Sequence, residues 1–296
     1  MKVRIGVGAG AHPFDAARGL AGLVDDLDQL GFDSLWLSEV LSAPAIDPLT
    51  GLAFAAALNP HLKLGVTMVL PGRNAVRLAK ELATLDRLSS GRLLVTFVPG
   101  LTQSPEAEAI NAPAAGRGAL IDDALPLLRR LWSGATVSHD GPAACFDSLR
   151  LSPLPVQDPL EAWLGGMAPA ALRRCGRLGD GWLPSLCTPA EAAAGRTVID
   201  EVAAAEGRAI SGEHFGVSVG YSHHPLPAGA RAAIAARRRG LDPAEVVPVG
   251  FGALRDLLEE YLAAGFSKFV VRPLEPPASW RPELEQLAAS VGDLQT

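Results

Sequence analysis

The chain has 296 residues, of which 48% are hydrophobic and 20% charged, with a formal net charge of −6. This composition supports a large apolar core. The one basic cluster, Arg237 to Arg239, follows an alanine-rich run and is typical of a solvated helix end, so we expect no nucleic-acid partner. Apolar runs are too short to cross a bilayer and the start lacks a secretory layout, which predicts a cytoplasmic protein without membrane contact.

The cysteines exclude two further classes of protein. Cys145, Cys175 and Cys187 are too few and too scattered for a disulfide framework or a zinc site. We therefore expect a reducing compartment and no metal.

Short β-branched runs alternate with stretches of helical period along the whole chain. Strands are expected at residues 3–7, 34–37, 64–70, 93–98, 162–164, 181–183, 215–221 and 266–271. Helices are expected at residues 16–30, 49–58, 74–88, 117–131, 169–178, 189–206, 254–264 and 282–291. Eight strand–helix pairs with no break in composition predict one α/β domain over residues 1–296, a (β/α)8 TIM barrel, which typically needs roughly 250 residues.

Two segments depart from this rhythm. Residues 133–158, after the fourth helix, are rich in Gly, Pro and Asp, and residues 223–242, after strand seven, contain an Ala- and Arg-rich helical run. We interpret both as insertions. A doubly wound open sheet is the alternative fold, but Gly6, Gly8 and Gly10 do not have the spacing of its phosphate-binding loop.

A pair of glycines follows the fifth strand and precedes a helix. Active sites of (β/α)8 enzymes lie at the carboxyl ends of the strands, and a helix start there offers free N–H groups to an anion. Four consecutive residues are therefore candidates for binding a cofactor phosphate: Gly165, Gly166, Met167 and Ala168. The alternative is a tight turn that needs glycine for a positive φ.

Three motifs carry a family resemblance. Residues 62–100 contain "LPGRN" and "LAKELATLDRLSSGRL", residues 155–185 contain "WLGG" and "DGW", and residues 31–40 read "GFDSLWLSEV". In this order and spacing they resemble the bacterial luciferase-like superfamily, (β/α)8 barrels that use flavin or the deazaflavin coenzyme F420. The resemblance implies a small hairpin in the first insertion. It also implies a bulge with a cis non-proline peptide at Thr67-Met68 against the cofactor ring, and cofactor contacts at Pro99 and Gly100, although the family more often has glycine where Pro99 stands.

The resemblance also shows what is missing. Related sugar-phosphate dehydrogenases read Ser-Asp-His after strand two, and their histidine takes a substrate proton, whereas this chain reads Ser38-Glu39-Val40. Their acid after strand four falls at Leu101. Glu39 is the remaining candidate for catalysis and cofactor contact, with a strand-end carboxylate bonded to backbone N–H groups as an equal alternative.

Three further residues lie at the expected active-site end, and we expect them to bind substrate: His12, His223 and Arg272. The predicted function is an oxidoreductase that moves hydride between coenzyme F420 and a small organic substrate. An FMN-dependent monooxygenase and a non-catalytic cofactor-binding barrel are the alternatives.

A homodimer is the expected assembly. The helical run 47–58 is apolar almost all round, so one side can face the barrel while the other needs cover. The outward side of the run 74–88 can join the same surface.

Overall fold

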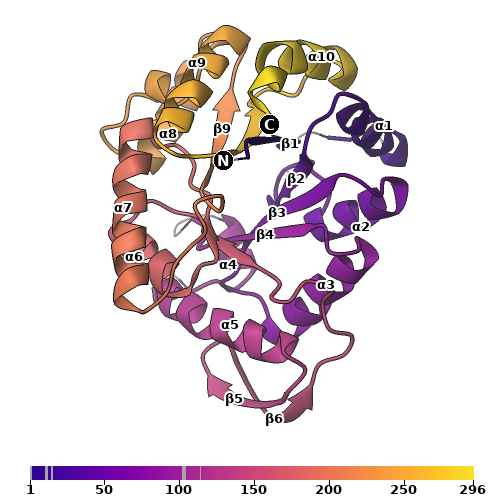
Figure 1. Ribbon diagram of the computed structural model, residues 1–296, viewed down its shortest axis with the longest axis vertical. Helices are drawn as coiled ribbons and strands as arrows, with labels where there is room; N and C mark the ends of the chain where they lie inside the picture. Colours follow the sequence, from indigo (N-terminus) through magenta and orange to yellow (C-terminus); the bar gives the residue numbers. More distant parts are fainter. Residues whose placement is uncertain (1, 11–12, 15, 102–104, 114) are drawn as a thin grey trace.

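A computed structural model describes residues 2–10, 13–14, 16–101, 105–113 and 115–296. Its centre is a parallel sheet of eight strands in the order β8-β7-β4-β3-β2-β1-β10-β9 (Figure 1). The strands are β1 (Arg4–Gly8), β2 (Ser34–Ser38), β3 (Lys63–Val69), β4 (Leu93–Val98), β7 (Ala162–Leu164), β8 (Gly181–Trp182), β9 (Gly216–Tyr221) and β10 (Lys268–Pro273). The parallel bridges Trp182↔Phe215 and Ser185↔Ser218 join β8 to β9 and close the sheet, which confirms the predicted TIM barrel.

Helices surround this barrel (Figure 1). They are α1 (Ala16–Gln29), α2 (Pro48–Leu58), α3 (Ala75–Leu88), α5 (Arg117–Trp132), α6 (Pro169–Leu178), α7 (Pro189–Ala205), α9 (Gly250–Ala263) and α10 (Trp280–Val291), with short 3-10 turns η1 (Pro243–Glu245) and η2 (Gly292–Leu294). Local signals set their ends: the Asn74 side chain accepts from the Arg77 N–H at the start of α3. The described part of the chain holds no helix long and apolar enough to cross a membrane.

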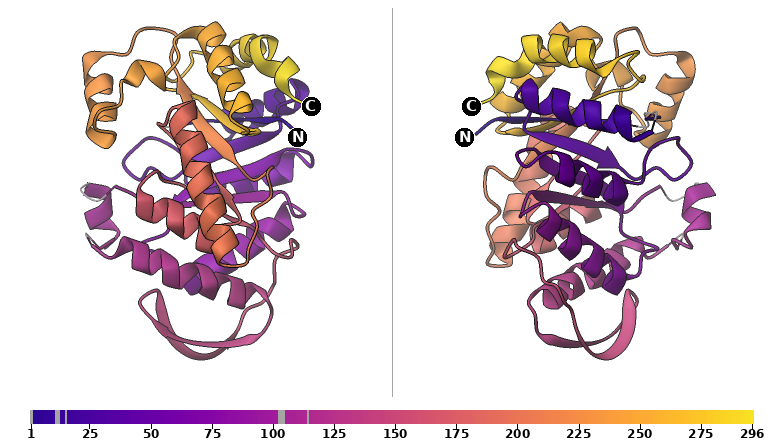
Figure 2. Two further views of the ribbon diagram at one scale, coloured as in Figure 1. Left: turned by 60° about the vertical axis from the view of Figure 1, so that its left-hand side comes forward. Right: turned by 90° about the vertical axis from the view of Figure 1, so that its right-hand side faces the viewer.

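Both predicted insertions are present. Residues 133–158 carry the antiparallel hairpin β5 (Thr136–Gly141) and β6 (Ala144–Arg150), which projects beyond α5 (Figures 1 and 2). Residues 223–242 carry α8 (Ala228–Arg237). A further helix that the sequence did not predict, α4 (Pro105–Ala109), lies between β4 and α5. Its five residues are too few to give a helical period in the sequence.

The barrel itself has a core of two parts, and Leu241, Val246 and Val247 form a separate small cluster. The larger lies between the strands and the outer helices, and the smaller fills the barrel with Trp36, Trp163, Leu183 and Val270 against Leu94. Glycines on neighbouring strands make room for the two tryptophans. A Cβ at Gly65 would lie 2.1 Å from the Trp36 ring, and one at Gly181 would lie 2.4 Å from the Trp163 ring. The two indole rings therefore pack tightly against the glycines of the neighbouring strands inside the barrel.

Candidate active site at the carboxyl ends of the strands

A cavity of about 490 Å³ opens where the parallel strands end. In the right-hand view of Figure 2 both termini lie at one end of the barrel and α4 lies at the other. The cavity is at the α4 end, as the fold predicts. Its walls come from the ends of β2, β3 and β4, the turn before α6, the segment after β8, and α4 and α8: Glu39, Val40, Leu41, Thr67, Val69, Val98, Pro99, Gly100, Leu101, Glu106, Ala107, Ile110, Ala112, Arg117, Gly166, Met167, Ser185, Leu186, Arg237 and Arg238.

Glu39 joins the ends of two strands. One carboxylate oxygen accepts from the Val69 N–H at 2.8 Å, and the other lies 2.5 Å from the Arg73 guanidinium. The side chain is only 9% exposed. Both oxygens thus have partners already, which favours the alternative reading of Glu39 as a structural strand-end carboxylate. Because Glu39 also lines the cavity, its contact with the cofactor stays a prediction.

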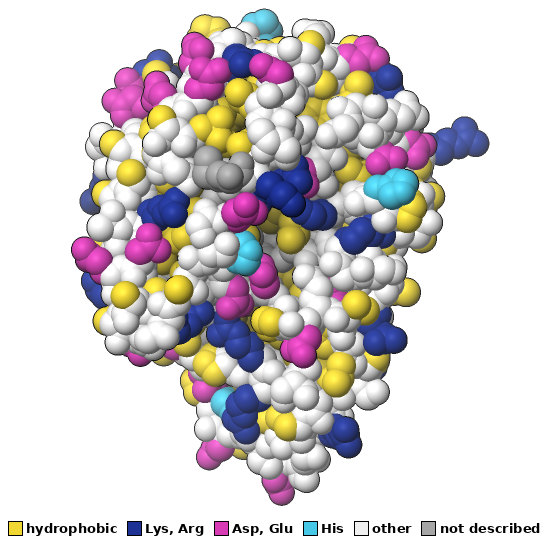
Figure 3. Space-filling view, in the orientation of Figure 1, with side chains coloured by type: hydrophobic (Ala, Val, Ile, Leu, Met, Phe, Trp, Pro, Cys, Tyr) yellow, Lys and Arg dark blue, Asp and Glu magenta, His cyan; other side chains and the backbone are white. Residues whose placement is uncertain are grey.

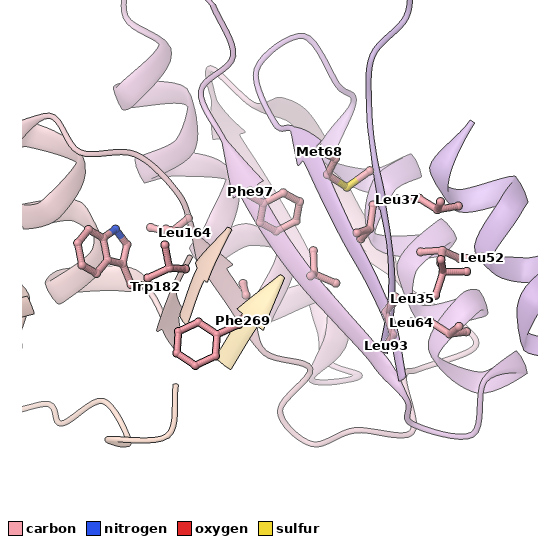
Figure 4. Close-up of a cluster of buried hydrophobic side chains, with 14 of the residues drawn as sticks. Leu35, Leu37, Leu52, Leu64, Met68, Leu93, Phe97, Leu164, Trp182 and Phe269 are labelled. Atoms are coloured by element: carbon pink, nitrogen blue, oxygen red, sulfur yellow. The ribbon is translucent and has the colours of Figure 1, made fainter. Parts of the chain in front are cut away.

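The prediction of a bulge with a cis peptide bond at Thr67-Met68 is wrong. Among the described residues, cis peptide bonds occur only before Pro153 and Pro159. The β3–β4 register runs without interruption from Leu64↔Leu93 to Val69↔Val98. Regular alternation therefore sends Thr67 into the cavity wall and Met68 to the opposite face, where it is fully buried with Leu37 and Leu64 (Figure 4). Met68 is a core residue, not a cofactor contact.

An arginine that the sequence analysis did not predict stabilises the turn after β4. Arg117, at the start of α5, donates from Nε to the Pro113 carbonyl at 2.6 Å and from Nη1 to the carbonyls of Pro99 and Leu101. Gly100 adopts φ +71° here, which only glycine takes without strain. The sequence feature that could have indicated this role is an arginine at the start of the helix after the fourth strand.

Arg117 also keeps one donor free. The residue is 5% exposed and lines the cavity, yet its buried Nη2 has no hydrogen-bond partner among the described residues. A buried donor without a partner costs free energy unless a ligand accepts from it. An anionic or carbonyl oxygen in the cavity would satisfy it.

The turn between β7 and α6 has the conformation that the double glycine predicts. Gly166 has φ +107° and its carbonyl accepts from Trp182 Nε1 at 3.1 Å. No side chain caps the N-terminus of α6 in the described structure. Pro169 has no N–H and the Ala171 N–H donates to the Ala168 carbonyl at 2.7 Å, so the Ala170 N–H is the donor that the first turn leaves for an anion. Gly166 and Met167 line the cavity, whereas Gly165 packs against Val98 and Ala168 lines an adjoining hollow.

The structure tests one of the two predicted histidines. His12 lies outside the described residues. The His223 imidazole points to α10, with Nε2 2.9 Å from Glu283 Oε1, and stacks edge-on against Phe251 of α9. Two residues apart, His223 and the buried Tyr221 share the outer side of β9, and both contact Glu283. The expectation that His223 faces the substrate is therefore corrected.

Arg272 is on the inner side of the barrel. It follows Val270 of the interior cluster by two residues, so the two side chains share one face of β10. No hydrogen bond or ion pair to its guanidinium is found within the described structure. Burial, and then the charge of Arg237 on α8, lower the pKa of Arg272.

The positions of the missing acid–base pair are apolar. Val40 and Leu101 both line the cavity and are 38% and 50% exposed. The nearest carboxylates in the wall are Glu39, already paired, and Glu106, which accepts from the Ser42 N–H at 2.7 Å. Among the described wall residues, no imidazole is available to take a proton.

Comparison with known proteins identifies the family. The sequence profile of the luciferase-like monooxygenase family matches residues 1–288. The chain belongs to this family. Among curated members it is 31% identical over 225 residues to an F420-dependent glucose-6-phosphate dehydrogenase of Beutenbergia cavernae, covering 71% of this chain and 63% of that one. It is 28% identical over 170 residues to a limonene 1,2-monooxygenase of Rhodococcus erythropolis, covering 56% and 44%.

These matches span only part of each curated family member. The match to a second F420-dependent glucose-6-phosphate dehydrogenase, from Nakamurella multipartita, is 28% identical and covers 63% of this chain and 59% of that protein. Among solved structures, the F420-dependent tetrahydromethanopterin reductase of Methanopyrus kandleri has a TM-score of 0.79 at 17% identity, covering all of both chains. A monooxygenase of Streptomyces bottropensis has a TM-score of 0.77 at 20% identity, covering 98% and 99%. These two likenesses establish the shared luciferase-like barrel.

Proposed function

We propose that this family member is an oxidoreductase that binds coenzyme F420 in the cavity at the carboxyl ends of the strands and exchanges hydride with a small organic substrate. The unpartnered Nη2 of Arg117 carries this proposal, because a buried cationic donor in the cavity wall is stabilised when a ligand oxygen accepts from it. Similarity to F420-dependent dehydrogenases supports the choice of cofactor.

The residues present fit such a cofactor. The Ala170 N–H in the first turn of α6, after the wall residues Gly166 and Met167, and the guanidinium of Arg117 are donors for a phosphate. Val69, Val98 and Leu186 provide apolar wall for a ring. When bound, the deazaflavin supplies the hydride chemistry, and the protein orients it and excludes water.

An FMN-dependent monooxygenase is the second candidate. Apolar Val40 and Leu101, where related dehydrogenases carry an acid–base pair, favour it, since oxidation of an alcohol needs a proton acceptor. The similarity to limonene 1,2-monooxygenase points the same way. A barrel that binds cofactor without turnover is the third.

Titration of the purified protein with F420 and, separately, with FMN tests the choice. We expect F420 to bind with a perturbed visible spectrum and FMN to bind more weakly. Binding of FMN alone would favour the monooxygenase. Binding of neither would refute the function.

We also propose a homodimer through α2. Its outward side exposes Phe54 and Leu58, 36% and 43%, and the adjacent α3 exposes Leu88, 62%. Sedimentation at micromolar concentration should give twice the 30.8 kDa of one chain, and Ala56→Glu should restore the monomer. A monomeric wild type would contradict the dimer.

A further inference from the structure

The side chains that point into the barrel change from apolar to polar between one inward position of a strand and the next. The lower interior cluster is apolar, with Trp36, Leu94, Trp163, Leu183 and Val270. Side chains two residues apart share a face of a strand. Two residues further toward the carboxyl end of the same five strands, the inward positions are Ser38, Thr96, Gly165, Ser185 and Arg272. An apolar layer is thus followed by small and polar residues, where TIM barrels usually continue with bulky branched ones.

Hydroxyl groups form a row on one side of this interior. Ser38 pairs with Thr67, and Thr67 pairs with Thr96, in direct register across three neighbouring strands. Thr96 is 1% exposed, and its buried hydroxyl has no hydrogen-bond partner among the described residues. A hydroxyl in this position can donate to a ligand oxygen.

Arg272 lies on the opposite side of the closed barrel, four strands from Thr96 in the sheet order. Glycines flank it on both neighbouring strands. A Cβ at Gly8 would lie 3.2 Å from Arg272 Cβ, and a Cβ at Gly220 would lie 3.7 Å from its guanidinium carbon. The missing side chain at Gly8 leaves room for Arg272, whereas the space over Gly220 is shared with Leu274, whose Cδ2 would lie 2.7 Å from an added Cβ.

We propose that Arg272, with the hydroxyl of Thr96 at the floor, forms a well that binds the carboxylate of the substrate. This inference rests on the proposed function and assigns the substrate class of the same site, a small carboxylic acid. The guanidinium presents parallel N–H donors that match the two oxygens of a carboxylate. A carboxylate there would pair a partly buried cation that has no counter-ion in the described structure.

The apolar wall above the well fits the rest of such a substrate. Val69, Val98 and Leu186 lie in the cavity beside Thr67 of the hydroxyl row. Arg237, at the rim on α8, adds positive charge that attracts an anion toward the opening. A linear or branched acid with an apolar tail therefore matches both ends of the site.

The test uses two probes of one shape, hexanoate and its neutral amide, hexanamide, titrated into the cofactor-free protein by calorimetry. We expect the wild type to prefer the acid by about 10- to 100-fold, the range for hydrogen bonds to a charged group. Arg272→Met should abolish this preference, and Thr96→Val should weaken acid binding by about fivefold. Arg231→Met, an exposed arginine of α8 outside the cavity wall, is the matched control and should behave like the wild type.

Cofactor titration of the same variants separates this inference from the proposed function. Arg272→Met should keep its F420 affinity and its circular dichroism melting curve. Equal binding of acid and amide by the wild type overturns the carboxylate well, as does loss of F420 affinity in Arg272→Met with the acid preference intact, since Arg272 would then contact the cofactor. A wild type that prefers the acid but binds neither F420 nor FMN refutes the proposed function and supports the well.

Discussion

Charged side chains are paired at one end of the barrel and partly unpaired at the other, and we call these two ends its mouths. At the amino ends of the strands, Figure 3 shows basic and acidic side chains intermingled around a central hollow. The hollow, of about 200 Å³, is lined by charges that neutralise each other. Arg4 and Lys63 lie 3.2 and 3.4 Å from Asp33, and Lys268 lies 3.8 Å from Glu213.

At the carboxyl ends, arginine donors remain unused. Arg117 and Arg238 each keep one buried nitrogen without a partner, and Arg272 has no partner within the described structure. Neutralised charge leaves little for a ligand to gain, whereas unused donors give a ligand its binding energy. We therefore expect the charges at the amino ends to contribute to stability and those at the carboxyl ends to bind a ligand.

The largest expected effect is a loss of stability from a substitution at the amino-end mouth. Trp36→Ala removes a 7%-exposed side chain from the interior cluster and should lower the free energy of unfolding by about 3–5 kcal/mol, measured by urea denaturation. Cofactor affinity of the folded variant should stay within about twofold. Val156→Ala, at a 52%-exposed position outside the proposed dimer surface, is the control and should change stability by less than about 0.5 kcal/mol. A large loss of affinity with unchanged stability would contradict the assignment.

The second prediction concerns cofactor affinity at the carboxyl-end mouth. Arg117→Met should weaken cofactor binding by about 10- to 100-fold, because it removes a charged donor, as fluorescence titration would show. The variant also loses contacts with three carbonyls, so Arg117→Lys serves as the milder change and should give an intermediate affinity. Arg4→Met at the opposite mouth should leave affinity unchanged. Equal losses in Arg117→Met and Arg4→Met would remove the distinction.

Backbone strain sharpens the comparison. Gly166→Val forces a side chain onto φ +107° beside Ala171, and should cost about 1–3 kcal/mol of stability together with cofactor affinity. Gly207→Val, at φ +68° with open space around it, carries similar strain far from the cavity. Only the first should lose affinity in a calorimetric titration. If both variants bind alike, the turn before α6 does not contact the cofactor.

The smallest effect concerns the paired charges. Asp33→Asn removes the partner of Arg4 and Lys63, both partly exposed, and should lower the free energy of unfolding by about 1 kcal/mol or less. The difference should shrink in about 1 M salt, where screening is strong. A loss that persists in salt would mean that packing, not charge, is the contribution of Asp33.

Sequence periodicity predicted the helices and strands more reliably than the direction of individual side chains. The run 74–88 became α3, Ala75–Leu88, because its cap and stripe are local signals. Glu39, Thr67, Pro99, Gly100, Gly166 and Met167 reached the cavity wall because strand ends in a barrel share one mouth. Met68 and His223 failed because strands buried on both faces do not reveal which alternation points inward.

Arg117 and Arg238 were missed for a different reason. Each comes from a helix or its end that returns to the cavity, so its position depends on tertiary packing and not on local pattern. Only the register of the closed sheet brings Arg272 to the side of the barrel opposite Thr96.

The close fit of glycine to tryptophan inside the barrel has an evolutionary consequence. A Cβ at Gly65 would lie 2.1 Å from the Trp36 ring and one at Gly181 would lie 2.4 Å from the Trp163 ring, both closer than non-bonded carbon atoms approach. Neither glycine can mutate while its tryptophan stays, so the order of substitution is fixed: the ring must shrink first. In related sequences, a residue larger than glycine at position 65 should therefore occur only with a smaller residue at position 36, and the two positions should covary as a pair.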